Sequence, residues 1–83
     1  MDFKVYVLYS PSYHKIYIGF TSDLDARLLA HNQLATKGWT IKFRPWIVIY
    51  TETFFSKKEA MAREKQLKSA KGRLFIKSLI SNK

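Results

Sequence analysis

The N-terminal part of the chain holds two short runs rich in Val, Ile, Tyr and Phe, and each predicts a β-strand. The runs cover residues 3–9 and 15–21, and in both the side chains alternate between the two faces of a strand. Residues 10–13, Ser-Pro-Ser-Tyr, have the composition of a turn and suit a four-residue hairpin loop. The pattern therefore predicts an antiparallel β-hairpin.

This hairpin brings two tyrosines to one face. If Tyr9 pairs with His14, Tyr6 lies directly opposite Tyr17, with Cβ atoms about 5 Å apart. Gly19 shares that face and is expected to leave open space beside the pair. Taken alone, the pair favours a structural role, because cross-strand aromatic pairs stabilise sheets.

Residues 22–34 predict the first helix. Ser22 is expected as the N-cap, and Asp25 three residues later completes a capping-box pattern. The apolar stripe at helical spacing is formed by Leu24, Leu28 and either Leu34 or Ala35. Arg27 and His31 are four residues apart, so they share a face that adjoins this stripe.

The most hydrophobic stretch of the chain is residues 46–50, Trp-Ile-Val-Ile-Tyr. A continuous apolar run of this length predicts a central strand buried on both faces, extending to about Thr53. The preceding residues 35–43 contain Gly38 and Trp39 and predict a loop.

A second helix is predicted over residues 57–70, with Ser56 and Glu59 forming another capping-box pattern. Its inward side is marked by Ala60, Met61, Leu67 and Ala70. Glu64 lies on that same side, where a carboxylate is costly to bury unless it is paired or holds a metal. The structural alternative is an ion pair with Lys68, one turn later.

Gly72 is expected at the C′ position that ends this helix. A last helix over residues 73–80 then buries Phe75, Ile76, Leu79 and Ile80. The element order β-β-α-β-α-α predicts an α+β (α/β) fold with a sheet layer against a helix layer. A chain of 83 residues has room for one domain, which we expect to cover residues 1–83.

Composition and charge narrow the function. The chain is 47% hydrophobic and 16% aromatic, which favours a folded domain over a disordered basic tail. Fifteen Lys and Arg against six Asp and Glu give 15 − 6 = +9, which favours a polyanionic partner such as nucleic acid. No apolar run has the length of a membrane span, the N-terminus lacks signal-peptide order, and there is no cysteine. We therefore expect a cytoplasmic protein without disulfides or a membrane partner.

The residues with unusual inward or shared-face positions could together cleave a phosphodiester. A single carboxylate, here Glu64, can hold a hydrated Mg²⁺ that binds phosphate. Arg27 offers a planar fork to phosphate oxygens as charge builds up. A phenol of Tyr6 or Tyr17 can position or deprotonate water if a base such as His31 accepts its proton. Residue spacing alone does not establish this chemistry.

Four segments resemble the GIY-YIG endonuclease superfamily in the right order. Lys4-Val5-Tyr6 keeps the tyrosine of the first motif, and Tyr17-Ile18-Gly19 matches the second letter for letter. Residues 21–27 resemble the helix start that carries the family's arginine, and residues 59–68 resemble the helix that carries its glutamate. The resemblance covers nearly the whole chain. The chain is therefore similar to the short, stand-alone, single-domain bacterial members of the superfamily.

The resemblance implies a three-stranded antiparallel sheet flanked by helices and DNA cleavage that depends on Mg²⁺ or Mn²⁺, with repair or recombination structures as substrates. It assigns Tyr6 and Tyr17 as the motif tyrosines, Arg27 as the phosphate-stabilising residue and Glu64 as the metal ligand. His31 matches a histidine found one turn after the arginine in some members. The basic residues expected to hold nucleic acid, DNA first and RNA as an alternative, are Lys15, Arg27, Lys65 and Lys68.

Two other interpretations remain open. The fold could serve as a nucleic-acid-binding module without catalysis, since residues 75–77 stand where the family often has an asparagine and Asn82 comes later. The predicted loop aromatics Tyr13 and Trp39 could instead form the surface of a protein-interaction adaptor. The family resemblance also leaves room for a protein partner that supplies substrate targeting.

Overall fold

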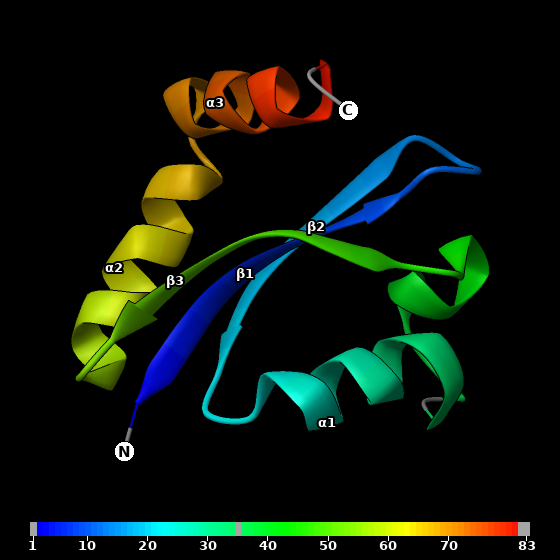
Figure 1. Cartoon of the computed structure of the whole chain (residues 1–83), viewed down its shortest axis with the longest axis horizontal. Helices are drawn as coiled ribbons and strands as arrows, with labels where there is room; N and C mark the ends of the chain where they lie inside the picture. The colour runs from blue at the N-terminus through cyan, green and yellow to red at the C-terminus, as the bar shows by residue number, and fades with distance from the viewer. Residues whose placement is uncertain (1, 35, 82–83) are drawn as a thin grey trace.

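A three-stranded antiparallel sheet with three helices forms the fold (Figure 1). The computed structural model describes residues 2–34 and 36–81. The elements in chain order are β1 (Phe3–Ser10), β2 (Lys15–Thr21), α1 (Leu24–Leu29), β3 (Ile47–Phe54), α2 (Lys57–Leu67) and α3 (Ala70–Ser81). The predicted α+β class and the order β-β-α-β-α-α are confirmed. Among the described residues, no helix combines the length and apolar character needed to span a membrane.

The central strand is β1, because the strand order is β2-β1-β3. Its residues Val5, Tyr6, Val7 and Leu8 are all buried. β3 forms an edge, and its side chains are at most partly buried, so the prediction of a central strand at residues 46–50 was wrong. A short apolar run indicates a strand, but its place in the sheet depends on which neighbours pair with it.

Helices cover both faces of the sheet (Figure 1). On one face Val5 and Val7 pack with Ala60 and Leu67 of α2 and Ile76 of α3. The side chains that alternate with them point to the other face. There Tyr6 and Leu8 form a second cluster with Trp46, against which Leu24 and Leu28 of α1 pack. The sequence predicted one helix layer against the sheet, whereas helices pack on both of its faces. The central strand β1 is therefore buried on both sides.

The hairpin register differs from the expected one by two residues. Ser10 pairs with Lys15, so Tyr6 lies opposite Gly19 and Tyr17 lies opposite Leu8. Ser10 remains in the strand, and the loop closes where the backbone N–H of His14 donates to the Ser10 carbonyl at 2.8 Å. Because the shift is an even number of residues, Tyr6 and Tyr17 still share one face.

The first helix begins one residue later than predicted. Asp23, not Ser22, is the N-cap, and its Oδ1 accepts from the backbone N–H of Ala26 at 3.1 Å. After α1 the helical backbone continues as a π-helical turn, η1 (Ala30–Leu34). The helical region therefore reaches Leu34 as predicted, but Leu34 is exposed and does not extend the apolar stripe. Ala35 lies outside the described residues.

A 3₁₀ helix, η2 (Trp39–Phe43), occupies part of the predicted loop and is held against η1. The Asn32 side chain donates to the Trp46 carbonyl at 3.0 Å and accepts from the Trp46 N–H at 2.6 Å. The Trp46 indole in turn donates to the Thr40 carbonyl at 2.8 Å. These bonds satisfy buried polar groups and fix η2 beside the sheet.

The second helix starts as predicted and ends earlier. Ser56 is the N-cap, accepting from the Glu59 backbone N–H and donating to the Glu59 carboxylate. The helix stops at Leu67, and Ala70 already belongs to α3. Met61 is exposed, so of the expected inward residues only Ala60 and Leu67 reach the core from α2.

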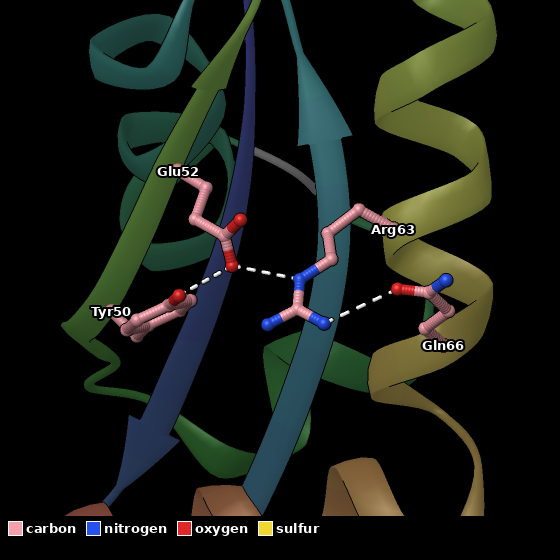
Figure 2. Close-up of polar contacts among 4 residues, drawn as sticks. All are labelled: Tyr50, Glu52, Arg63 and Gln66. Atoms are coloured by element: carbon pink, nitrogen blue, oxygen red, sulfur yellow. Dashed lines mark hydrogen bonds and ion pairs between the residues drawn. The ribbon is translucent and has the colours of Figure 1, made fainter.

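An ion pair ties α2 to the edge strand β3 (Figure 2). Arg63 donates to the Glu52 carboxylate at 2.8 Å and to the Gln66 side chain at 3.2 Å. Tyr50 donates to the same Glu52 oxygen. Burial raises the pKa of Glu52, but the hydrogen bonds from Tyr50 and Arg63 outweigh it and lower this pKa overall. Glu52 therefore acts as a charged anchor that orients α2.

Gly72 lies in the first turn of α3 and does not form the predicted C′ cap. A Cβ at this position would lie 2.3 Å from the Gln66 carbonyl oxygen and 2.5 Å from the Leu67 Cα. Glycine is therefore required because α3 approaches the last turn of α2 so closely. Beyond this turn, Ile76 is buried as predicted, while Phe75 is partly exposed and packs edge-on against Tyr50. Asn82 lies outside the described residues.

We predict that Gly72→Ala lowers the free energy of unfolding by about 1–3 kcal/mol, because the methyl group would collide with backbone atoms. In an open helix the same change would raise stability by up to about 1 kcal/mol, so the sign tests the contact. Urea unfolding measures the difference, with Lys71→Ala on the same turn as the control. A Gly72→Ala protein as stable as the wild type would contradict the close approach of α3.

Candidate functional site

Tyr6 and Tyr17 lie side by side on the face of the sheet that α1 covers. Their ring centroids are 6.2 Å apart with an interplanar angle of 29°. Gly19 lies beneath Tyr6, and a Cβ there would approach the Tyr6 hydroxyl oxygen to 2.7 Å. The sequence analysis expected open space beside Gly19. In the structure the Tyr6 phenol fills that space. Glycine at this position lets the phenol lie flat against the strand.

A cavity of about 570 Å³ opens where β1, β2, the start of α1 and α2 meet. The polar side chains that line it and carry a phenol or a charge are Tyr6, Tyr17, Arg27, Lys57 and Glu64. Tyr6 and Tyr17 come from adjacent strands, and Arg27 and Glu64 come from helices on different sides of the sheet. The structure thus brings together four of the five residues that the sequence singled out.

The fifth, His31, lies behind Tyr6 and does not line the cavity. Its Nε2 is 3.3 Å from the Tyr6 hydroxyl, and its Nδ1 is 3.0 Å from the Thr40 hydroxyl. His31 and Thr40 are only 8% and 7% exposed. The Tyr17 ring centroid is 4.7 Å from that of His31. Both ring nitrogens of a buried histidine are therefore hydrogen-bonded, and one partner is a tyrosine of the cavity.

The electrostatic environment shifts the pKa values of His31 and Tyr6 in opposite directions. Burial lowers the pKa of His31, and the positive charges of Arg27 and Arg44 lower it further. Burial raises the pKa of Tyr6, and Tyr17 and Glu64 add to this effect while Arg27 opposes it. At neutral pH His31 is therefore an uncharged imidazole and Tyr6 a neutral phenol, so one ring nitrogen of the histidine is free to accept a hydrogen bond.

Arg44 fixes the backbone that carries His31. Its Nε donates to the His31 carbonyl at 2.5 Å, and its Nη2 donates to the Ala30 carbonyl at 3.2 Å. These carbonyls belong to the π-helical turn η1. Neither Arg44 nor Thr40 was predicted as a site residue, because no spacing rule links Thr40 of the predicted loop, or Arg44 just after it, to the helix that precedes them.

The surroundings of Glu64 fit the kind of metal ion that the GIY-YIG resemblance implies. The Glu64 side chain is partly exposed and lines the cavity, and it forms an ion pair with Lys68, whose Nζ is 3.7 Å from Oε1. The ion pair expected as the structural alternative is therefore present, but it is long and its lysine is half-exposed. A hard cation such as Mg²⁺ binds few carboxylates and keeps several waters, so one carboxylate in a roomy polar cavity fits it.

The basic residues divide into two groups. Lys68 lies near the cavity through its contact with Glu64. Lys15 and Lys65 are exposed, and neither lines the cavity; the Lys15 ammonium lies 5.6 Å from the Phe43 ring centroid instead. Lys57, at the first position of α2, does line the cavity and was missed. Its position became apparent only once the direction of α2 across the sheet was known.

Comparisons with known proteins identify the family of the chain. A family model described as the GIY-YIG catalytic domain matches residues 3–77. A UPF0213 protein of Staphylococcus haemolyticus is 38% identical over 56 residues, 68% of each chain. The UPF0213 protein YazA of Bacillus subtilis is 36% identical over 70 residues, 81% of this chain and 71% of YazA. The solution NMR structure of a UPF0213 protein from Bacillus halodurans is 30% identical, with a TM-score of 0.56 over 95% of this chain and 85% of that one.

Some relatives extend well beyond the matched segment. The chain spans 66% of the length of a UPF0213 protein from Staphylococcus epidermidis and 56% of one from Streptococcus pneumoniae. The family model nevertheless covers both tyrosine motifs and the helices that carry Arg27 and Glu64. The chain therefore belongs to the GIY-YIG family.

Proposed function

We propose that this protein is an endonuclease that hydrolyses DNA phosphodiester bonds with Mg²⁺ or Mn²⁺, acting on repair or recombination structures. The observation that carries the proposal is the convergence of two phenols, a guanidinium, an ammonium and a carboxylate on one cavity, with a neutral histidine behind one phenol. The net charge of +9 and the absence of cysteine suit a cytoplasmic protein that meets nucleic acid.

The cations of the cavity would bind the scissile phosphate. Arg27 offers two parallel N–H donors to non-bridging phosphate oxygens, and its charge opposes the negative charge that builds up as water attacks. Lys57 adds a second positive charge at the same cavity. Both side chains are exposed, so they can reach a substrate that lies across the mouth of the cavity.

The contact between Tyr6 and His31 supports a path for the proton of the attacking water. As the oxygen of water forms a bond to phosphorus, the bridging P–O bond breaks, and the sugar oxygen leaves with its electron pair and takes a proton from solvent. Tyr6 takes a proton from the attacking water and gives its own proton to His31 Nε2. This transfer requires the tautomer in which Nδ1–H donates to Thr40 Oγ1. Thr40 is therefore a positioning residue for His31.

Glu64 would hold the divalent ion. When bound, such an ion supplies Lewis-acid stabilisation of phosphate charge. The chain's own contribution is a carboxylate held at the cavity by a helix that is fixed on two sides, by the packing of Ala60 and Leu67 and by the pairing of Arg63 with Glu52.

We predict that Glu64→Gln reduces metal-dependent DNA cleavage by about 100-fold or more while leaving the fold and DNA binding nearly intact, because the amide binds a hard cation poorly. Cleavage of a panel of supercoiled, single-stranded, flapped and branched DNA, with parallel RNA substrates, measures the effect. Glu59→Gln makes the same charge change on α2 away from the cavity and serves as the control.

The same experiment distinguishes an endonuclease from the main alternative, a nucleic-acid-binding module without catalysis. Metal-dependent cleavage at the wild-type rate by folded Glu64→Gln protein would contradict the metal role. DNA binding without cleavage by the wild-type protein on every substrate would instead support a nucleic-acid-binding module on the same fold.

We predict that Thr40→Val changes the tautomer of His31, because a methyl group cannot accept the Nδ1–H hydrogen bond. Nitrogen-15 NMR should find the proton on Nδ1 in the wild type and largely on Nε2 in the variant, with cleavage about ten-fold slower or worse. Thr40→Ser keeps the hydroxyl and should restore both. A wild-type spectrum with the proton on Nε2 would rule out the proposed path.

We predict that DNA affinity falls steeply with salt, because each neutralised phosphate releases counterions. Lys57→Ala should reduce the log–log slope for duplex DNA by about one. Lys58→Ala removes the neighbouring exposed lysine, which does not line the cavity, and should change the slope less. Fluorescence anisotropy at several salt concentrations measures both. Salt-independent affinity would contradict phosphate binding altogether.

A further inference from the structure

Three aromatic side chains form an exposed surface beside the hairpin loop, which we call the aromatic surface: Tyr13, Trp39 and Phe43. Phe43 lies between the other two, with ring centroids 5.5 Å from Tyr13 and 4.7 Å from Trp39. Tyr13 is 51% exposed and Trp39 47% exposed, so each presents a large part of its ring to solvent. Figure 1 shows the β1–β2 loop and η2, the two segments that supply these rings, next to each other.

The charged residues of the two segments that supply the aromatic surface are all positive. Residues 10–15 and 36–44 supply it, and these two segments contain no Asp or Glu. Lys15 extends over the Phe43 ring, with Nζ 5.6 Å from the centroid, and Lys42 is exposed on η2. Flat rings interleaved with ammonium groups complement a ligand that carries both aromatic faces and negative charge.

The aromatic surface and the candidate site are linked through β2 and through His31. Lys15 and Tyr17 are two residues apart on β2, so they point to the same face of the sheet. Trp39 adjoins Thr40, which is hydrogen-bonded to His31, and His31 packs against Tyr17. A nucleic-acid strand that left the cavity along β2 past Tyr17 would reach Lys15 and then the exposed rings.

We propose that the aromatic surface binds the unpaired bases of a single nucleic-acid strand that flanks the cavity, with Tyr13 and Trp39 stacking on bases and Lys15 and Lys42 contacting phosphates. This proposal rests on the proposed function in taking nucleic acid as the ligand. A duplex stacks its bases on one another, so only unpaired bases offer a free face to an aromatic ring. The surface would thus select substrates with a single-stranded segment next to the cleaved bond.

The test is equilibrium binding in the presence of a chelator, so that no cleavage occurs. Fluorescence anisotropy is measured with a labelled oligothymidine strand, an abasic strand of equal length and a labelled duplex. Trp39→Leu and Tyr13→Leu remove the flat rings but keep apolar side chains against Phe43. Phe55→Leu, which alters an aromatic residue that is 82% exposed and directly follows the C-terminal end of β3, is the matched control.

We expect wild-type protein to bind the oligothymidine more tightly than the abasic strand. Trp39→Leu and Tyr13→Leu should each weaken oligothymidine binding by about five-fold or more, as expected for loss of stacking on one base. Abasic and duplex binding should change by less than about two-fold, and Phe55→Leu should change none of the three. Quenching of Trp39 fluorescence by the oligothymidine gives a second readout, because the other tryptophan, Trp46, is buried.

Three results would overturn the proposal. The first is a wild-type affinity for the abasic strand equal to that for oligothymidine. The second is an oligothymidine affinity that is unchanged in folded Trp39→Leu and Tyr13→Leu proteins. The third is a loss of oligothymidine affinity in Phe55→Leu equal to that in the other two variants. Binding of an acidic peptide such as polyglutamate that is lost in Trp39→Leu, with oligothymidine binding unaffected, would assign the surface to a protein partner instead. Because binding is measured without divalent metal, failure of the cleavage mechanism would leave these results unchanged.

Discussion

The hydrogen bond between Tyr6 and His31 is the interaction on which the rest of the site depends. Tyr6 lies on the central strand and is buried, so its hydroxyl needs a partner, and leaving it without one would cost about 1–3 kcal/mol. His31 can act as the hydrogen-bond partner of Tyr6 only if its ring points toward the sheet. Thr40 binds its other nitrogen and Arg44 holds its carbonyl. Residues of η1 and η2 thus hold the histidine that satisfies one buried phenol.

The cavity also combines residues from the two faces of the sheet. Glu64 belongs to a helix that packs on the Val5 and Val7 face, yet it reaches a cavity lined by tyrosines of the opposite face. It does so because α2 is fixed by apolar burial, by the Arg63 pair with Glu52, and at its end by the close contact with Gly72. Small shifts of α2 would move the carboxylate relative to Arg27, so elements far from the cavity affect its chemistry.

Much of the site was predictable because it depends on local rules. Alternation along β1 and β2 places Tyr6 and Tyr17 on one face in any register that differs by an even number of residues, and the structure keeps that face while changing the pairing. The Ser56 cap was also correct, since its hydrogen bonds involve only residues three positions apart. The cap at Ser22 was wrong because Asp23, the next residue, competes for the same role.

The sequence by itself determined the element order, the residues that share a face, and the candidate set of Tyr6, Tyr17, Arg27, His31 and Glu64. Tertiary structure decided that β1 is the central strand and that Thr40 and Arg44 meet His31. It also decided that Lys57 joins the cavity while Lys15 lies beside Phe43. The physical reason is the range of the interactions: alternation, helical spacing and capping act within a few residues, whereas strand pairing and helix direction depend on how distant segments bury their apolar faces together.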